Sequence, residues 1–185
     1  MEFTLDGTPI DAKGRRPYLE RFIHGAVYGA RPDINSVVHS HSPSVIPFSV
    51  TGQKLRAVTQ LGAAIGHDVP VWDSRDKFGD TDLLVRNPDM GGDLARRLGG
   101  NTAAMMRGHG CVVAGRTIRE AVYAAVYMEI NARLQTHAMA IATGEIRYLS
   151  PGEIDAVAVG TSPSVIDRAW ENWCLRAGRP FKPSA

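Results

Sequence analysis

The sequence predicts an α/β or α+β fold, and three observations support this prediction. Strand-like and helix-like segments alternate along the chain. Apolar residues make up 44% of the chain and charged residues 22%, which is ordinary globular usage and excludes a disordered or collagen-like chain. The 185 residues also suffice for one core, since a globule of this size buries roughly 70% of its unfolded surface. We therefore expect a single domain over residues 1–185.

The N-terminal part is expected to hold a short strand, a helix and a second strand. Residues 3–5 are strand-like. The helix should begin at Pro17, a favoured first-turn residue, and end before Pro32. Its apolar residues recur at helical spacing: Leu19, Phe22, Ile23, Ala26, Val27 and Ala30. A strand over residues 35–41 follows.

The middle of the chain is less regular. Residues 55–59 and 69–72 are interpreted as short strands, and residues 73–82 as a charged loop. A short helix is expected over residues 93–98, where the glycine pair that begins at Gly99 ends it.

The remainder combines two strands with the clearest helix of the sequence. Strands over residues 102–106 and 111–114 flank a Gly-His-Gly unit. The long helix over residues 117–143 starts with a T-x-x-E capping box. Shorter helices should begin at Ser150 and run over residues 162–178.

Charge and cysteine content exclude several classes of function. The net charge is +2 and no basic stripe stands out, so we expect no nucleic-acid partner. Cys111 and Cys174 are too few for a disulfide framework or a CxxC metal site. Because the sequence shows no signal peptide and no apolar run approaching about 18 residues, we expect a cytoplasmic protein without a membrane partner.

Two histidines on one strand are the first feature that carries chemistry. Side chains of a strand alternate with a period of two, so His39 and His41 point to the same face, about 7 Å apart at a rise of about 3.3 Å per residue. Two imidazoles at this spacing can converge on one metal ion. Alone, the pair is equally compatible with two polar residues on a solvated strand face.

A third histidine strengthens the metal interpretation. His109 lies between two glycines, which allow unusual backbone angles and close approach to a ligand. Three imidazoles without thiolates fit an open catalytic site for one divalent ion per chain, Zn or Mn. The alternative is a histidine in a tight turn, satisfied by backbone hydrogen bonds.

The candidate acid/base is Glu20, at the edge of the apolar face of the first helix. An exposed helix carboxylate beside His24 is the plainer interpretation. His24, His67 and Arg107 are candidate substrate contacts; a turn position for His67 and a structural salt bridge for Arg107 are equally open.

The chain resembles the class II aldolase/adducin family. The matching segments are YLERFIH around Glu20, ARPD from Ala30, VVHSHS around His39, and RGHG around His109, followed by the long helix. They cover roughly residues 17–150, and their order and separation make the resemblance specific.

The resemblance implies properties that spacing alone does not show. The fold would be a three-layer α/β/α sandwich around a mixed, largely antiparallel sheet. His39, His41 and His109 would hold the metal, and Glu20 would be the acid/base. The family's usual state is a homotetramer with active sites at subunit interfaces. The activity would be that of a metal-dependent lyase that stabilises an enolate-type anion.

One departure affects the expected substrate. Sugar-phosphate members carry a Gly-Asn phosphate cradle near the N-terminus, and nothing before Pro17 matches it. Either the chain lacks an N-terminal segment or it holds its substrate differently. Overall likeness favours the branch around 3-hydroxy-2-methylpyridine-4,5-dicarboxylate 4-decarboxylase, hence decarboxylation of a hydroxy-substituted aromatic or pyridine carboxylate. The alternatives are a sugar-phosphate aldolase or 4-epimerase and, in another class, a non-catalytic adducin-like interaction module.

Overall fold

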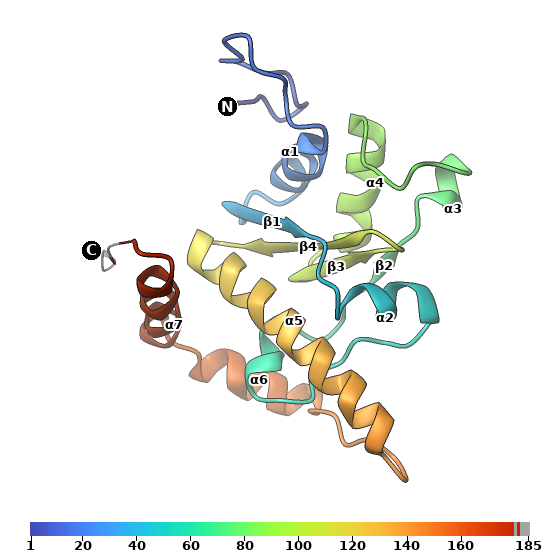
Figure 1. Cartoon of the computed structure of the whole chain (residues 1–185), viewed down its shortest axis with the longest axis vertical. Coiled ribbons are helices and arrows are strands. Elements are labelled where there is room, and N and C mark those ends of the chain that lie inside the picture. The colour runs from blue at the N-terminus through green and yellow to red at the C-terminus, as the bar shows by residue number, and fades with distance from the viewer. Residues whose placement is uncertain (180, 182–185) are drawn as a thin grey trace.

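The computed structural model describes residues 1–179 and 181, which are built around a four-stranded sheet (Figure 1). The strands are β1 (Ser36–Ser40), β2 (Val71–Trp72), β3 (Ala103–Met106) and β4 (Gly110–Gly115). Their order is β1-β4-β3-β2, with β1 and β3 antiparallel to β4 and β2 parallel to β3. The prediction of a mixed, largely antiparallel sheet is confirmed.

Helices cover both faces of this sheet. Those of the described residues are α1 (Arg21–Ala30), α2 (Ile46–Thr51), α3 (Arg75–Phe78), α4 (Pro88–Leu98), α5 (Ile118–Ile141), α6 (Pro151–Gly160), α7 (Pro163–Arg176) and the 3₁₀ helix η1 (Leu61–Ile65). In Figure 1, α1 and α4 lie on one side of the sheet and α5 on the other. This arrangement confirms the three-layer α/β/α sandwich.

Strand β3 shows how the period of two builds the layers. Ala104 and Met106 belong to the apolar cluster on the side of α1 and α4. Ala103 and Met105 belong to the cluster on the other side, which includes Met128 of α5. All four residues of the strand are at most 1% exposed, so β3 is buried on both faces.

Several helix boundaries differ from the sequence prediction. Helix α1 begins at Arg21 rather than Pro17. Helix α4 begins at Pro88, earlier than expected, because the Asn87 side chain accepts the Met90 N–H and caps it. The predicted loop 73–82 contains the short helix α3, and α2 and η1 were not predicted.

The long helix was predicted well, but its cap differs in one detail. Thr117 Oγ1 accepts the Glu120 N–H at 3.1 Å, as expected. The Glu120 carboxylate, however, accepts the backbone N–H of Arg116 at 3.0 Å rather than that of Thr117. At α6 the full capping box of Ser150 and Glu153 is present.

The strand predicted over residues 55–59 is wrong. Residues 54–58 bond to the side-chain amides of Asn131 and Gln135 on α5 instead of a neighbouring strand, and the Ala57 carbonyl accepts the Leu149 N–H at 2.9 Å. Alternating burial makes the segment look like a strand, while the amides take the place of a strand partner.

The N-terminal segment packs against α1. The strand expected at residues 3–5 is reduced to an isolated bridge between Phe3 and Pro9. Arg21 Nε donates to the Gly7 carbonyl at 2.5 Å. A Cβ on Gly25 would lie 2.1 Å from the Leu5 carbonyl oxygen, so only glycine permits this crossing.

Across the residues that the structure describes, no helix combines the length and apolar character needed to span a membrane.

Candidate metal centre

The pairing of β1 with β4 brings the predicted histidines together. His39 lies on β1 opposite Val112, and Ser40 is opposite Cys111. His41 follows the end of β1. His109 lies in the turn that joins β3 to β4, so it reaches the end of β1 although it is 68 residues from His41.

The two glycines beside His109 are required for this arrangement. Gly108 has φ +66°, a left-handed conformation that glycine adopts readily. A Cβ on Gly110 would lie 2.3 Å from the Ser40 carbonyl oxygen. The Gly-His-Gly unit therefore serves both a tight turn and a close approach of backbones, as the sequence indicated.

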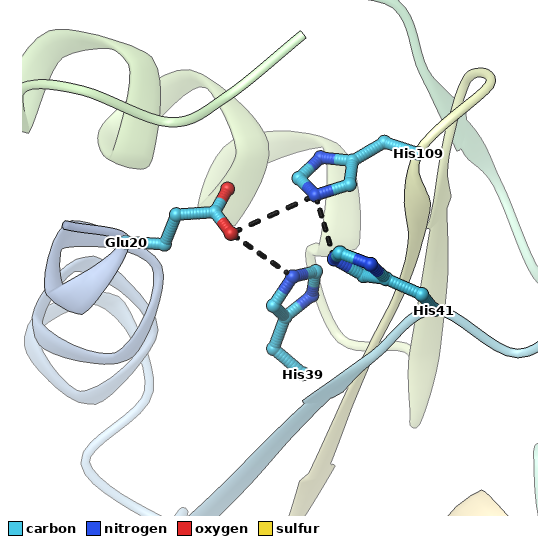
Figure 2. A group of neighbouring side chains, drawn as sticks. All are labelled: Glu20, His39, His41 and His109. Atoms are coloured by element: carbon cyan, nitrogen blue, oxygen red, sulfur yellow. Dashed lines mark hydrogen bonds and ion pairs between the residues drawn. The ribbon is translucent and has the colours of Figure 1, made fainter. Parts of the chain in front are cut away.

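Figure 2 shows Glu20, His39, His41 and His109 pointing toward one another. The Nε2 atoms of His41 and His109 are 3.0 Å apart. Glu20 Oε2 lies 3.3 Å from His39 Nε2 and 3.6 Å from His109 Nε2. Each side chain offers one ligand atom, and these four atoms all lie within 4.8 Å of one another. The cluster can hold a metal ion.

His39 is oriented by a backbone carbonyl. Its Nδ1 lies 3.1 Å from the Cys111 oxygen, which can only accept, so Nδ1 carries the proton. Nε2 then presents its lone pair to the cluster, where it is buried and has no hydrogen-bond donor. A carbonyl partner on the far nitrogen is the usual support of a metal-ligating histidine.

The electrostatics favour neutral imidazoles. Burial lowers the pKa of His39 and of His109 from the ordinary value of 6.5, and the negative charge of Glu20 opposes this shift in both cases. Neutral imidazole is the form that binds metal ions.

Glu20 is placed differently from the prediction. It lies at the N-cap position of α1, outside the helix. It is only 5% exposed, so it is not the exposed helix carboxylate that the plainer interpretation expected. Its Oε1 accepts the Val85 N–H at 3.2 Å, and its Oε2 faces the histidines. The structure thus brings Glu20 to the three histidines.

Two of the three candidate substrate contacts lie near the cluster. His24 is partly buried on α1, and the centres of its ring and the Tyr18 ring are 6.4 Å apart in an edge-on arrangement. Burial lowers the pKa of His24, and the charge of Glu20 opposes this. Arg107 precedes the Gly-His-Gly unit and pairs with Asp73, with 2.6 Å from Nε to Oδ2. This ion pair is the structural alternative that the sequence left open.

His67 lies elsewhere. It pairs with Asp155 at 2.8 Å and lines a cavity of about 400 Å³. That cavity includes Gly115, which pairs with Ser36, so it lies at the end of the β1–β4 pair opposite to the cluster. None of the four cluster residues lines it.

Sequence reasoning missed the backbone contacts of the site. Val85 and the Cys111 carbonyl each hold a cluster residue through the main chain. Since any residue type can supply a backbone N–H or carbonyl, no motif indicates these contacts.

The fold and the cluster define an α/β protein with a candidate metal centre at one end of its sheet. The comparisons with known proteins make this more specific. Residues 1–136 match the model of the class II aldolase and adducin N-terminal domain. The chain belongs to this family.

Curated relatives include decarboxylases. The decarboxylase tropJ of Talaromyces stipitatus is 35% identical, over 92% of this chain and 71% of its own length. A 3,4-dihydroxyphthalate decarboxylase of Arthrobacter keyseri is 29% identical, over 60% of this chain and 44% of its own. The L-fuculose phosphate aldolase of Escherichia coli K12 is 28% identical, over 83% of this chain and 67% of its own length. Decarboxylases and aldolases are lyases, which confirms the predicted enzyme class at the level of the family.

Solved structures support the fold. An aldolase II superfamily protein from Pseudomonas syringae superposes with a TM-score of 0.70, over 95% of this chain and 72% of that one, at 22% identity. The L-fuculose 1-phosphate aldolase from Glaciozyma antarctica gives a TM-score of 0.69 at 25% identity, over 96% of this chain and 70% of that one.

Proposed function

We propose that this chain is a divalent-metal-dependent decarboxylase of an aromatic hydroxy acid, with a hydroxy-substituted pyridine carboxylate as one candidate substrate. The observation that carries the proposal is the convergence of three imidazoles and one carboxylate, with His39 Nε2 buried and without a hydrogen-bond partner. The similarity to tropJ and to the dihydroxyphthalate decarboxylase supports decarboxylation.

In this proposal His39, His41 and His109 hold the ion. Three neutral imidazoles are a donor set that suits Zn or Mn. The ion would act as a Lewis acid toward substrate oxygens and lower the energy of the negative charge that develops. The exclusion of water by the buried side chains of His39 and His109 strengthens such electrostatic effects.

Glu20 would move the proton. Decarboxylation of an aromatic acid breaks the bond between the ring and the carboxylate, CO₂ leaves, and the electron pair of that bond takes up a proton at the ring carbon. Glu20 supplies this proton from the oxygen that faces the cluster and recovers one from solvent. Such a positioned acid contributes typically about 10²–10⁴-fold to the rate.

The test combines an assay with one conservative variant. The metal-loaded protein is given 3,4-dihydroxyphthalate, 3-hydroxy-2-methylpyridine-4,5-dicarboxylate and L-fuculose 1-phosphate, and released CO₂ and aldehyde are measured separately. We expect CO₂ from an aromatic acid, and Glu20→Gln should keep the metal while losing about 10²-fold or more of the turnover. Aldehyde release alone would favour the aldolase alternative, and full activity of Glu20→Gln would refute the role of Glu20.

Three further predictions go with this proposal and are open to direct measurement. They are a homotetramer with active sites at subunit interfaces, one domain over residues 1–185, and substrate contacts by His24, His67 and Arg107. Because His67 lies at the opposite end of the β1–β4 pair from the cluster, a direct role in catalysis would need a contribution from another subunit.

A further inference from the structure

The two oxygens of Glu20 have different surroundings. Oε1 accepts the N–H of Val85, a residue that is 0% exposed, at 3.2 Å. Oε2 faces His39 and His109 at 3.3 and 3.6 Å. Because Val85 belongs to residues 79–87, the loop between α3 and α4, this loop decides how the carboxyl group is turned.

Two hydroxyl groups hold the loop in place. Thr81 Oγ1 accepts the Leu83 N–H at 3.0 Å and lies 3.0 Å from Ser74 Oγ. Ser74 is 3% exposed, so the pair is anchored in the protein interior. Leu83, two residues before Val85, has φ +67°. This left-handed conformation is rare outside glycine and persists only where the surroundings impose it.

The same segment is tied to the Gly-His-Gly unit. Asp73, next to Ser74, forms the ion pair with Arg107. The Leu83 side chain packs at Gly108, where an added Cβ would meet its Cδ1 at 3.6 Å. The loop therefore contacts both sides of the cluster, at Glu20 and beside His109.

We propose that Ser74 and Thr81 are positioning residues that hold the Val85 N–H against Glu20 Oε1, so that Oε2 is the oxygen that carries the transferred proton. The inference rests on the proposed function, in which Glu20 is the acid. Since the Val85 donor occupies Oε1, an acid proton is placed on Oε2, beside the histidines and the substrate. Both hydroxyls act on Glu20 through the backbone of Val85.

The first arm of the test needs no substrate. Amide hydrogen exchange at Val85 is followed by NMR in the full chain with its metal bound. Thr81→Val removes the acceptor for Leu83, and we expect Val85 to exchange roughly tenfold faster, in keeping with the loss of one hydrogen bond. The matched control is Thr59→Val, because Thr59 Oγ1 also accepts a backbone N–H, that of Gly62 at 3.0 Å, in the turn before η1. Val85 exchange should not change in this control.

The second arm measures turnover of the aromatic acid that releases CO₂. Thr81→Val should lower kcat by about 10- to 100-fold with little change in KM, because a misplaced catalytic group loses rate rather than binding. Thr81→Ser keeps the hydroxyl and should restore most of the rate. In a Glu20→Gln background, Thr81→Val should cause no further loss, since the two changes act on one group. Metal content and Tm should match those of Thr59→Val.

The outcomes separate this inference from the proposed function. Unchanged exchange at Val85 in Thr81→Val would overturn the inference whatever the activities. A loss of rate that persists undiminished in the Glu20→Gln background would also overturn it, because Thr81 would then act on something other than Glu20. Full activity of Glu20→Gln alone would refute the role of Glu20 as the acid in the proposed function, while the exchange result would still report whether the loop holds Glu20.

Discussion

The molecule contains two groups of polar side chains that differ in how their hydrogen bonds are satisfied. Asn131 and Gln135, at 0% and 1% exposure, each donate one and accept one hydrogen bond of 2.8–2.9 Å with the backbone of residues 54–58. In the histidine cluster, by contrast, two Nε2 atoms face each other at 3.0 Å and His39 Nε2 has no hydrogen-bond partner.

This difference distinguishes a structural polar group from a site that binds. A satisfied amide pair holds its neighbours in one arrangement and gains nothing from a ligand. Buried nitrogens without partners are costly unless something binds them. The histidine cluster is therefore suited to binding a metal ion. The amides of Asn131 and Gln135 instead fix the backbone of residues 54–58 in place.

The largest expected effect is on metal content. His39→Ala should lower it from about one divalent ion per chain to near zero, because it removes a buried ligand atom that has no hydrogen-bond partner within the protein. His137→Ala, at an exposed position of α5, is the matched control and should keep the ion. Elemental analysis of the purified proteins measures both. If His39→Ala keeps about one metal ion per chain, the histidine cluster is not the metal site, and the contrast between a binding site and a structural polar group fails.

The next effect is on stability and should come from the amide group. Gln135→Leu leaves the Arg56 N–H and the Lys54 carbonyl without partners, so the free energy of unfolding should fall by about 2 kcal/mol. Gln53→Leu, at an exposed amide, should change it by less than about 0.5 kcal/mol. Urea unfolding gives the free energies, and elemental analysis should find the ion in both variants. If Gln135→Leu loses the metal and keeps its stability, the amide group would serve metal binding rather than structure, contrary to our assignment.

The smallest expected effect is the pH dependence of stability of the metal-free protein. The pKa values of His39 and His109 lie below the ordinary 6.5, so the unfolded chain binds more protons than the folded chain as the pH falls through 6.5 toward these lowered values. Stability should therefore be present in full above 6.5 and fall below it. His39→Ala should flatten this decline and Gln135→Leu should leave its slope unchanged. A steeper decline in His39→Ala would contradict the assignment.

Much of the fold and the cluster could be predicted from sequence, because periodicity and glycine placement are local signals. The period of two placed His39 and His41 on one face of a strand. The two glycines beside His109 indicated that its backbone could turn tightly and approach a ligand. Helix α5 followed from its capping pattern and length.

What could not be predicted depends on tertiary partners. Residues 55–59 have a strand pattern, but whether their partner is a strand or two amides depends on where α5 lies. Glu20 was expected at the edge of a helix face, and its burial at the N-cap follows from the loop that Val85 belongs to. His67 gave no sign that it would lie at the opposite end of the sheet.

The pairing of β1 with β4 also links metal binding to folding. His41 and His109 are separated by 68 residues, so they meet only after a long loop has closed, which is a slow and entropically costly step. Of the four cluster residues, only His39 and His41 are close in sequence, so an unfolded chain does not hold the set together. Metal binding thus reports a completed sheet, and free metal would shift the equilibrium toward chains that have already finished folding.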